Sequence, residues 1–246
     1  MKRFHALTAG LLLGLAAAAP AADVATFTKA YFGSTKPGSW AKYEQISTDP
    51  KGKVQKTEVT LSRLEGEGSR VWLEMRSVPK EGAKGKPTTI RYLLNTDFDV
   101  EKNALDYLKY VEKLVMQEDG KEAMEYPAEM LRQVGAAFAS NVDYGASVAP
   151  LGPCASAGRT GEKYRMQGSF EVNLMIVKMK GTTDTELCLS DAVPFGRLSE
   201  RTVTTSDKGK PMGTTEMLLL DSGTGATSAI KGTPKKMEMP ALPWGG

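Results

Sequence analysis

The stretch 163–180, KYRMQGSFEVNLMIVKMK, carries the clearest structural signal in the chain. From Tyr164 onward its side chains alternate between apolar and polar, which is the period of a β-strand with one buried face. Near its end, Met175, Val177 and Met179 make the second face apolar as well, so we expect that end to be covered on both sides. The stretch therefore predicts one long strand in a sheet with an apolar face.

Outward from this stretch, the chain predicts further antiparallel strands joined by turns. The turn at 49–53, DPKGK, suits a hairpin because proline fixes φ and glycine allows a positive φ. Successive turns of an antiparallel meander alternate between its two ends, so the turns at 49–53 and 79–87 should share one end. The other expected strands are 39–47, 54–64, 70–78, 88–95, 185–189, 198–205 and 214–221.

Near residue 100 the hydrophobic period changes and predicts a helix. Over 103–117, Leu105, Leu108, Val111 and Val115 recur at intervals of three or four residues. That spacing places them on one side of an amphipathic helix. We therefore expect this helix to pack its apolar side against the sheet.

A second helix is expected over 127–140. Pro127 suits the first turn of a helix, and Leu131, Val134 and Phe138 mark its buried side. The apolar face of a sheet needs a second layer, which the insertion at about 100–140 would supply. The expected fold class is therefore mainly β (α+β), a curved antiparallel sheet or incomplete β-barrel covered by a two-helix insertion.

The N-terminus has the features of a cleaved secretion signal. Lys2 and Arg3 precede a short apolar run, 7–19, and small residues predict a cut after Ala21. An uncleaved membrane anchor is the alternative, but the run is too short to span about 30 Å of hydrocarbon. We expect a periplasmic protein with a signal peptide over 1–21, one β-rich domain over 22–230 and a mobile Pro-rich tail over 231–246.

The composition excludes several classes of function. The one histidine, His5, lies in the expected leader, so Ser-His-Asp and Cys-His catalysis and His-ligated zinc are excluded. The chain has 32 Lys and Arg against 29 Asp and Glu, and no dense basic face that would favour nucleic acid. The two cysteines, Cys154 and Cys188, are expected to form a structural disulfide, the alternative being a reactive or metal-binding thiol pair.

Three short motifs suggest chemistry, and each also has a structural explanation. Residues 218–223, LLLDSG, resemble the aspartic protease signature, but no second copy exists to supply the partner carboxylate. The acidic residues of 97–101 have the spacing at the start of a calcium loop without its later ligands. Methionines at 175 and 179 and at 237 and 239 offer thioethers for Cu(I), although methionine is also a common core filler.

The tripeptide Lys-Gly-Lys occurs three times, at 51–53, 84–86 and 208–210. Lysines near an anionic membrane surface contribute about 1 kcal/mol each, so these turns are candidates for transient membrane-surface contact. Charged hairpin tips also keep proteins soluble. Both interpretations stay open.

Several segments resemble a known family. They are GSWAKY at 38–43, SDAVPFG at 190–196, and the final Asp, Gly-Ala and Ser-Ala-Ile elements of 221–230. Over about 38–230 the chain resembles uncharacterised bacterial periplasmic proteins related to the lipoprotein-carrier (LolA/LolB-like) superfamily. The resemblance implies an incomplete β-barrel with helices across its concave side, and an apolar space that holds acyl chains. The expected disulfide and longer loops depart from the carriers.

We therefore expect a non-enzymatic carrier or sensor that binds an apolar ligand, such as a lipid or acyl chain, between sheet and helices, with no cofactor or metal. The first alternative is a structural or protein-interaction module of the cell envelope. An enzyme that uses carboxylates, Lys, Tyr or Ser is the second. Trp40 and Trp72 also fit a packed core. The residues expected to line the ligand space are Trp40, Trp72, Leu108, Val111, Leu131, Phe170, Leu174 and Ile176.

Overall fold

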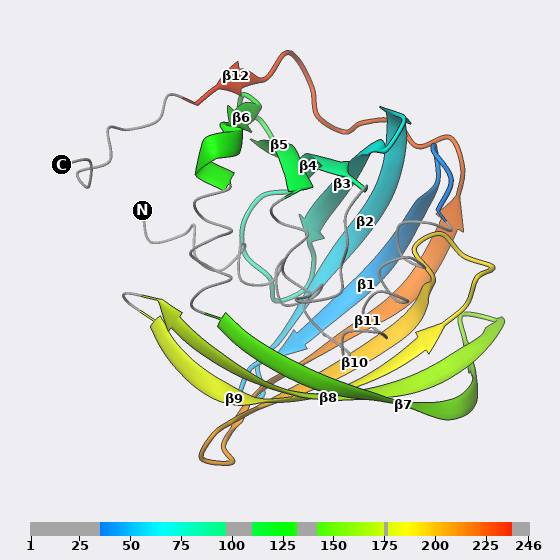
Figure 1. The fold of residues 1–246 in the computed structure, drawn as a ribbon, viewed down its shortest axis with the longest axis vertical. Coiled ribbons are helices and arrows are strands. Elements are labelled where there is room, and N and C mark those ends of the chain that lie inside the picture. Colours follow the sequence, from blue (N-terminus) through cyan, green and yellow to red (C-terminus); the bar gives the residue numbers. More distant parts are fainter. Residues whose placement is uncertain (1–34, 97–109, 132–141, 175–176, 238–246) are drawn as a thin grey trace.

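The strands form one curved sheet. The computed structural model describes residues 35–96, 110–131, 142–174 and 177–237. Within these ranges twelve strands join in the order β12-β6-β5-β4-β3-β2-β1-β11-β10-β9-β8-β7. Figure 1 shows the sheet bending so that β3–β5 and β7–β9 form opposite walls of an incomplete barrel. The expected mainly β fold with a curved sheet is confirmed.

Neighbouring strands are antiparallel except for β12, which runs parallel to β6. The strands are β1 (Trp40–Thr48), β2 (Val54–Glu67), β3 (Arg70–Pro79), β4 (Thr88–Asn95), β5 (Val111–Glu118), β6 (Met124–Tyr126), β7 (Val142–Ser156), β8 (Arg159–Leu174), β9 (Val177–Leu189), β10 (Arg197–Ser206), β11 (Pro211–Gly223) and β12 (Lys235–Lys236).

Alternation along the strands separates an inner from an outer face. On β3, Val71 and Leu73 are 5% and 4% exposed and belong to the core, whereas Trp72 between them points to the other face. Partners across neighbouring strands share a face, so Tyr92 of β4 lies beside Leu73 on the inner side. The buried core consists of Ala41, Tyr43, Val59, Val71, Leu73, Tyr92, Leu94, Val111, Cys188, Val193, Phe195, Leu198, Met217 and Leu219.

The helix expected over 103–117 is wrong. Residues Val111–Glu118 form β5, which pairs with β4 and β6, and 103–109 lie outside the described residues. Both faces of β5 are buried: Val111 belongs to the inner core, and Val115, which lies opposite the outer-face residue Arg91 of β4, is 1% exposed. A strand with two covered faces and a register shift thus produces apolar spacing that resembles a helix.

The second expected helix can be followed only at its start. Residues 128–131 are helical, and the Leu131 amide donates a 3.2 Å hydrogen bond to the Pro127 carbonyl, as expected for proline in a first turn. Residues 132–140 lie outside the described ranges. Because a strand replaces the first helix, the two-helix cover is not supported.

The long strand expected over 163–180 is a hairpin. Strand β8 ends at Leu174 and β9 begins at Val177, and these two residues pair antiparallel. Residues 175–176 between them lie outside the described ranges. The stretch that reads as apolar on both faces therefore belongs to two paired strands, in which Met179 lies opposite Val172, so its pattern no longer indicates a two-sided cover.

The 190–196 turn packs one end of the barrel. It joins β9 to β10 and inserts Val193 and Phe195 into the core, each 3% exposed. The Phe195 amide donates a 2.7 Å hydrogen bond to Thr35 Oγ1, and the Arg63 guanidinium donates to the Thr35 carbonyl oxygen. This turn therefore fills the inner face at the end where β9 stops and β10 begins.

A C-terminal segment, 224–237, crosses the outer face of β3–β5, from orange to red in Figure 1. Ser228 Oγ donates a 2.6 Å hydrogen bond to the Glu74 carboxylate, and the Ala229 amide donates another of 2.7 Å. Arg91 of β4 donates to Ser228 Oγ at 3.1 Å. Glu74 is 4% exposed, so a buried carboxylate anchors the segment through charge-assisted hydrogen bonds.

The same segment ends in β12. The amides of Lys235 and Met237 donate hydrogen bonds of 2.8 Å to the carbonyls of Ala123 and Glu125. The first part of the tail that we expected to be mobile is therefore paired with the sheet edge, and 238–246 lie outside the described ranges.

Candidate functional site

The inner face is apolar in the half of the barrel nearer the 190–196 turn. Tyr43, Leu73 and Leu219, from β1, β3 and β11, are at most 5% exposed there. Apolar side chains that are only partly buried pack against this core and offer the surface that an aliphatic ligand would contact. They are Leu61, Met75, Tyr110, Leu114 and Leu131.

On β1–β3 and β9–β11, the other half of the inner face is lined by hydroxyl and amide side chains. Strand pairing places Thr185, Thr202 and Thr215 in one row across β9, β10 and β11. The hydroxyls of Thr185 and Thr202 lie 2.9 Å apart and hydrogen-bond. Register puts further polar residues on the same face: Gln45, Ser47, Thr57, Ser77 and Thr204. On these strands the inner face thus changes from apolar to polar along the strand, whereas on β8 it stays apolar, with Met166 and Phe170 2% and 4% exposed.

A buried ion pair lies where these two halves meet. Arg197 Nη1 is 3.0 Å from Glu200 Oε2, with side chains 12% and 8% exposed. Arg197 also donates to the Met217 sulfur at 3.0 Å, and Thr202 donates to Glu200 at 3.3 Å. Because these groups satisfy one another, the network orients β10 against β11. The sequence motifs did not single out this pair.

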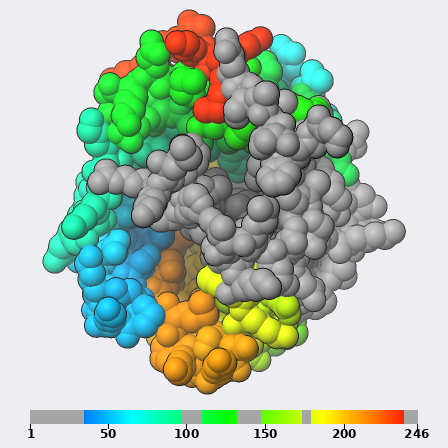
Figure 2. Space-filling model, turned by 90° about the vertical axis from the view of Figure 1, so that its left-hand side faces the viewer, coloured from blue at the N-terminus to red at the C-terminus, as the bar shows by residue number. Residues whose placement is uncertain are grey.

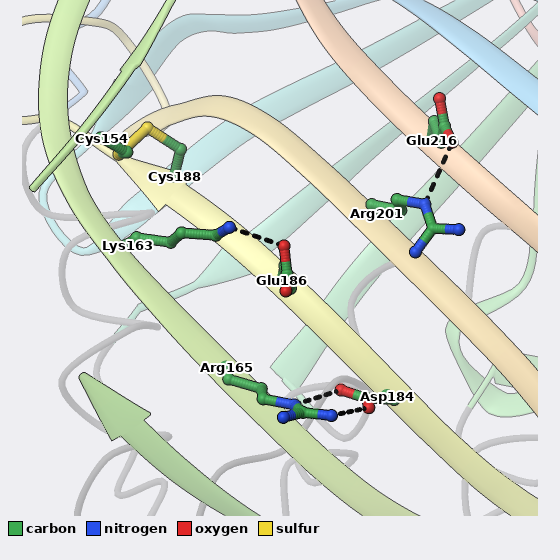
Figure 3. A network of polar contacts seen from close by, with 8 residues as sticks. All are labelled: Cys154, Lys163, Arg165, Asp184, Glu186, Cys188, Arg201 and Glu216. Atoms are coloured by element: carbon green, nitrogen blue, oxygen red, sulfur yellow. Dashed lines mark hydrogen bonds and ion pairs between the residues drawn. A yellow bond between two sulfur atoms is a disulfide. The ribbon is translucent and has the colours of Figure 1, made fainter. Parts of the chain in front are cut away.

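The outer face over β8–β11 carries cross-strand ion pairs, as Figure 3 shows. Lys163 lies 2.7 Å from Glu186, and Arg201 lies 3.2 Å from Glu216. Arg165 Nε donates to Asp184 at 2.9 Å, and this hydrogen bond lowers the pKa of the Asp184 carboxyl. These charges are paired on a solvated surface.

A pocket of about 230 Å³ lies on this outer face between the disulfide and the ion pairs. Its lining includes the paired side chains of Lys163, Glu186, Arg201 and Glu216, beside Leu218. Ligand pockets typically measure about 300–1,000 Å³ and are mostly apolar. This outer pocket is therefore a poor candidate for an apolar ligand.

The Cys154–Cys188 disulfide is present and links β7 to β9 across β8. A side chain at Gly161 of β8 would collide with the Leu189 carbonyl oxygen, so the strands approach closely at this point only because residue 161 is glycine. A structural disulfide is consistent with an extracytoplasmic location, where thiols are oxidised.

Three of the eight residues expected to line the ligand space lie on the inner side. Val111 and Phe170 are 8% and 4% exposed there, and Leu131 packs against the core. Phe170 lies over Gly181 of β9, where any Cβ would contact its ring. Leu174 ends β8.

Trp40 and Trp72 lie on the outer face and do not line the inner one. Trp40 Nε1 donates a 3.2 Å hydrogen bond to the Thr224 carbonyl, and the Arg91 guanidinium stacks 4.9 Å above the Trp72 ring. The two remaining residues, Leu108 and Ile176, lie outside the described ranges.

The motifs for other chemistry gain no support. Asp221 is exposed at the end of β11 and accepts the Ser222 amide at 2.8 Å. The 97–101 motif lies outside the described residues, as do Met175 and Met239. In the part of the chain that is described, no three His, Cys, Asp or Glu side chains converge as a metal site, and no helix is long and apolar enough to span a membrane.

No family model and no curated protein matches the chain. Among solved structures it is similar to a hypothetical protein from Chlamydia trachomatis, with 11% identity, a TM-score of 0.43, and coverage of 81% of this chain and 93% of that one. It is also similar to a protein from Bacteroides fragilis that is described as exported, with a YmcC-like fold. The identity is 7%, the TM-score is 0.40, and the match covers 76% of this chain and 97% of that one. A third similar structure is that of a protein from Parabacteroides distasonis described as a lipoprotein. The identity is 9%, the TM-score is 0.37, and the match covers 77% of this chain and 96% of that one. Likenesses at this level carry no information about function.

Proposed function

We propose that this chain is a non-enzymatic extracytoplasmic carrier or sensor that holds an apolar or amphiphilic ligand, such as a lipid or acyl chain, against the inner face of its incomplete barrel. The observation that supports this most is the division of that face into an apolar half and a hydroxyl-lined half. An acyl chain matches the first half, and an ester or carboxyl group matches the second.

Burial of the acyl chain would supply the affinity. Each methylene removed from water contributes about 0.8 kcal/mol, so about ten methylenes give roughly 8 kcal/mol, equivalent to a Kd of about 1 μM before ordering costs. Leu61, Met75 and Leu114 are the inner-face residues most suited to this contact because they are apolar and incompletely buried.

A structural or protein-interaction module of the envelope is the second candidate. It is favoured by Val193 and Phe195, which already fill one end of the inner face with side chains. In that case the inner face would be a core that admits no ligand.

Fluorescent fatty-acid binding by a matched pair of variants separates these candidates. Leu61→Trp adds bulk to the inner face, whereas Thr60→Trp adds the same bulk to the outer face of the same strand. We expect the purified parent and T60W to bind alike, and L61W to bind at least about tenfold more weakly because the ligand space is filled. Circular dichroism checks that each variant is folded.

Organic-solvent extraction of the purified parent provides a second readout. We expect it to release lipid. A folded parent that yields no lipid and binds no fatty acid would contradict the carrier proposal and favour the structural module.

A further inference from the structure

The three Lys-Gly-Lys turns lie side by side at one end of the sheet. They join β1 to β2, β3 to β4 and β10 to β11, and these six strands are consecutive in the order β4-β3-β2-β1-β11-β10. Figure 2 faces this end and shows the turns following one another along its lower left border, in teal, blue and orange. We call the three turns, 49–53, 80–87 and 206–210, the lysine rim.

The turns are fixed to their neighbours by backbone contacts. The Lys56 amide donates to the Glu81 carbonyl at 2.8 Å, which ties the second turn to the start of β2. Thr48 of β1 pairs with Thr214 of β11, which brings the first and third turns together. Strands lie about 4.8 Å apart, so neighbouring turns are about 10 Å apart, within roughly one Debye length at physiological salt. Their positive potentials therefore add.

Turn geometry explains the glycines but not the lysines. Gly52, Gly85 and Gly209 have φ of 79°, 121° and 71°, values that favour glycine. Nothing in this backbone requires lysine on both sides of each glycine. The flanking lysines, Lys51, Lys53, Lys84, Lys86, Lys208 and Lys210, are all exposed, and none forms an ion pair with a carboxylate of the described residues.

The lysine rim contains fewer acidic residues than lysines, and two of its three acids already have partners. Asp49 accepts the amides of Lys51 and Lys53 at 2.8 and 2.9 Å, and Glu81 pairs with Lys56 at 3.0 Å. The lysine rim holds seven lysines and three carboxylates, a net charge of +4, whereas the whole chain carries +3. The positive charge of the protein is therefore concentrated at this end.

The rim has a defined limit and an apolar component. Beyond β4 the next turn at this end, 119–122, carries two acids and Lys121, and Lys121 pairs with Glu118. Within the rim, Val54 follows Lys53 and is 45% exposed. Basic side chains around an exposed aliphatic one are the combination that binds the headgroup region of a membrane.

We propose that the lysine rim docks the protein on an anionic lipid surface, with the inner face opening toward that surface through its hydroxyl-lined half. The register places Thr204 and Ser47, on the inner face, beside the third and first turns. Docking by the rim does not require that the barrel holds a ligand, so it stands or falls separately from the carrier proposal.

Vesicle sedimentation tests the docking. The rim variant combines Lys51→Gln, Lys84→Gln and Lys208→Gln, one lysine from each turn. The control variant combines Lys36→Gln, Lys113→Gln and Lys236→Gln, which removes the same charge from exposed lysines elsewhere. The vesicles contain phosphatidylglycerol and phosphatidylcholine in equal parts, or phosphatidylcholine alone.

We expect the parent to bind the anionic vesicles, to lose binding as salt rises, and to leave pure phosphatidylcholine unbound. The rim variant should bind roughly 100-fold more weakly, since three lysines are removed from the surface, and the control variant should stay within about threefold of the parent. L61W should bind vesicles like the parent because its inner face is not used in this assay.

Three results would overturn the proposal. Equal losses in the rim and control variants would mean that net charge alone acts. A loss in L61W as large as that of the rim variant would mean that lipid uptake carries the binding. Retention of the parent on heparin, with no binding to anionic vesicles, would mean that the rim recognises a soluble polyanion.

Discussion

At the scale of single residues, an Arg–Glu ion pair contributes differently to stability on the two faces of the sheet. Arg197–Glu200 is buried on the inner side, and Arg201–Glu216, one strand position away, is exposed on the outer side. The desolvated pair cannot exchange its partner for water, whereas the exposed pair can.

Truncating the acid of each pair tests this difference. Glu200→Ala should lower the free energy of unfolding by about 3–5 kcal/mol because it leaves the Arg197 guanidinium buried without its carboxylate. Glu216→Ala should lower it by less than about 1 kcal/mol. Urea denaturation measures both. Equal losses would contradict the placement of Glu200 on the inner face.

Asp184 gives a pH dependence with a definite sign. Its pKa is lowered in the folded protein, mainly by the hydrogen bond from Arg165, so its ionised form contributes stability above the ordinary Asp pKa. That contribution is lost as the pH falls through the folded-state pKa. The carboxylate is partly exposed, so the effect is small.

Asp184→Asn should therefore flatten the acid limb of the stability curve. We expect the difference between parent and variant to be largest above about pH 5 and to vanish toward about pH 2, measured by denaturation at each pH. Asp191→Asn, in the exposed part of the 190–196 turn, is the control. A D184N curve parallel to that of the parent at every pH would show that the Arg165 interaction is not formed in solution.

At the scale of elements, the sequence predicts strands with one solvated face well and those covered on both faces poorly. The strands at 39–47, 54–64, 70–78 and 88–95 were predicted almost to their ends, since apolar and polar residues alternate in them. Strand β5 was predicted as a helix because its outer face is covered too. Its Gln117 side chain donates to the Lys231 carbonyl at 3.1 Å.

Contacts between distant parts of the chain could not be predicted from the sequence either. Glu74 alternates with Leu73 and Met75, so the pattern indicates a solvent-facing side chain. It is buried because Ser228, 154 residues later, binds it. A local pattern holds no information about a segment so far along the chain. The disulfide could be predicted because the chain has only two cysteines, and in an oxidising compartment they most simply pair with each other.

Proline substitutions test whether β12 holds the C-terminal segment. Lys235→Pro removes the amide that donates to the Ala123 carbonyl at the start of β6. In a parallel pair the next amide, that of Lys236, points away from β6, so Lys236→Pro is the control. Loss of one such hydrogen bond costs about 0.5–1.5 kcal/mol. We expect K235P to speed hydrogen exchange at Glu125 and Tyr126, and K236P to leave it near the parental rate. No change in K235P would contradict the β12–β6 pairing.

At the scale of the whole molecule, the sheet has two different faces and two different ends. The outer face is charged and crossed by a C-terminal segment, and the inner face changes from apolar to hydroxyl-lined along the strands. The apolar end is packed by the 190–196 turn, and the hydroxyl-lined end carries the lysine rim. The expectation of an incomplete barrel holds, but the proposed ligand binding now rests on the inner face of the sheet and not on a two-helix cover.

Photo-crosslinking with a diazirine fatty acid, mapped to single residues by mass spectrometry, tests the central claim most directly. Adjacent residues of β2 and β3 point to opposite faces, so each labelled position reports which face holds the acyl chain. We expect adducts on Leu61 and Met75 and none on Thr60 or Arg76, as the carrier proposal requires. Adducts confined to the outer-face residues, or no adducts at all on the folded protein, would contradict it.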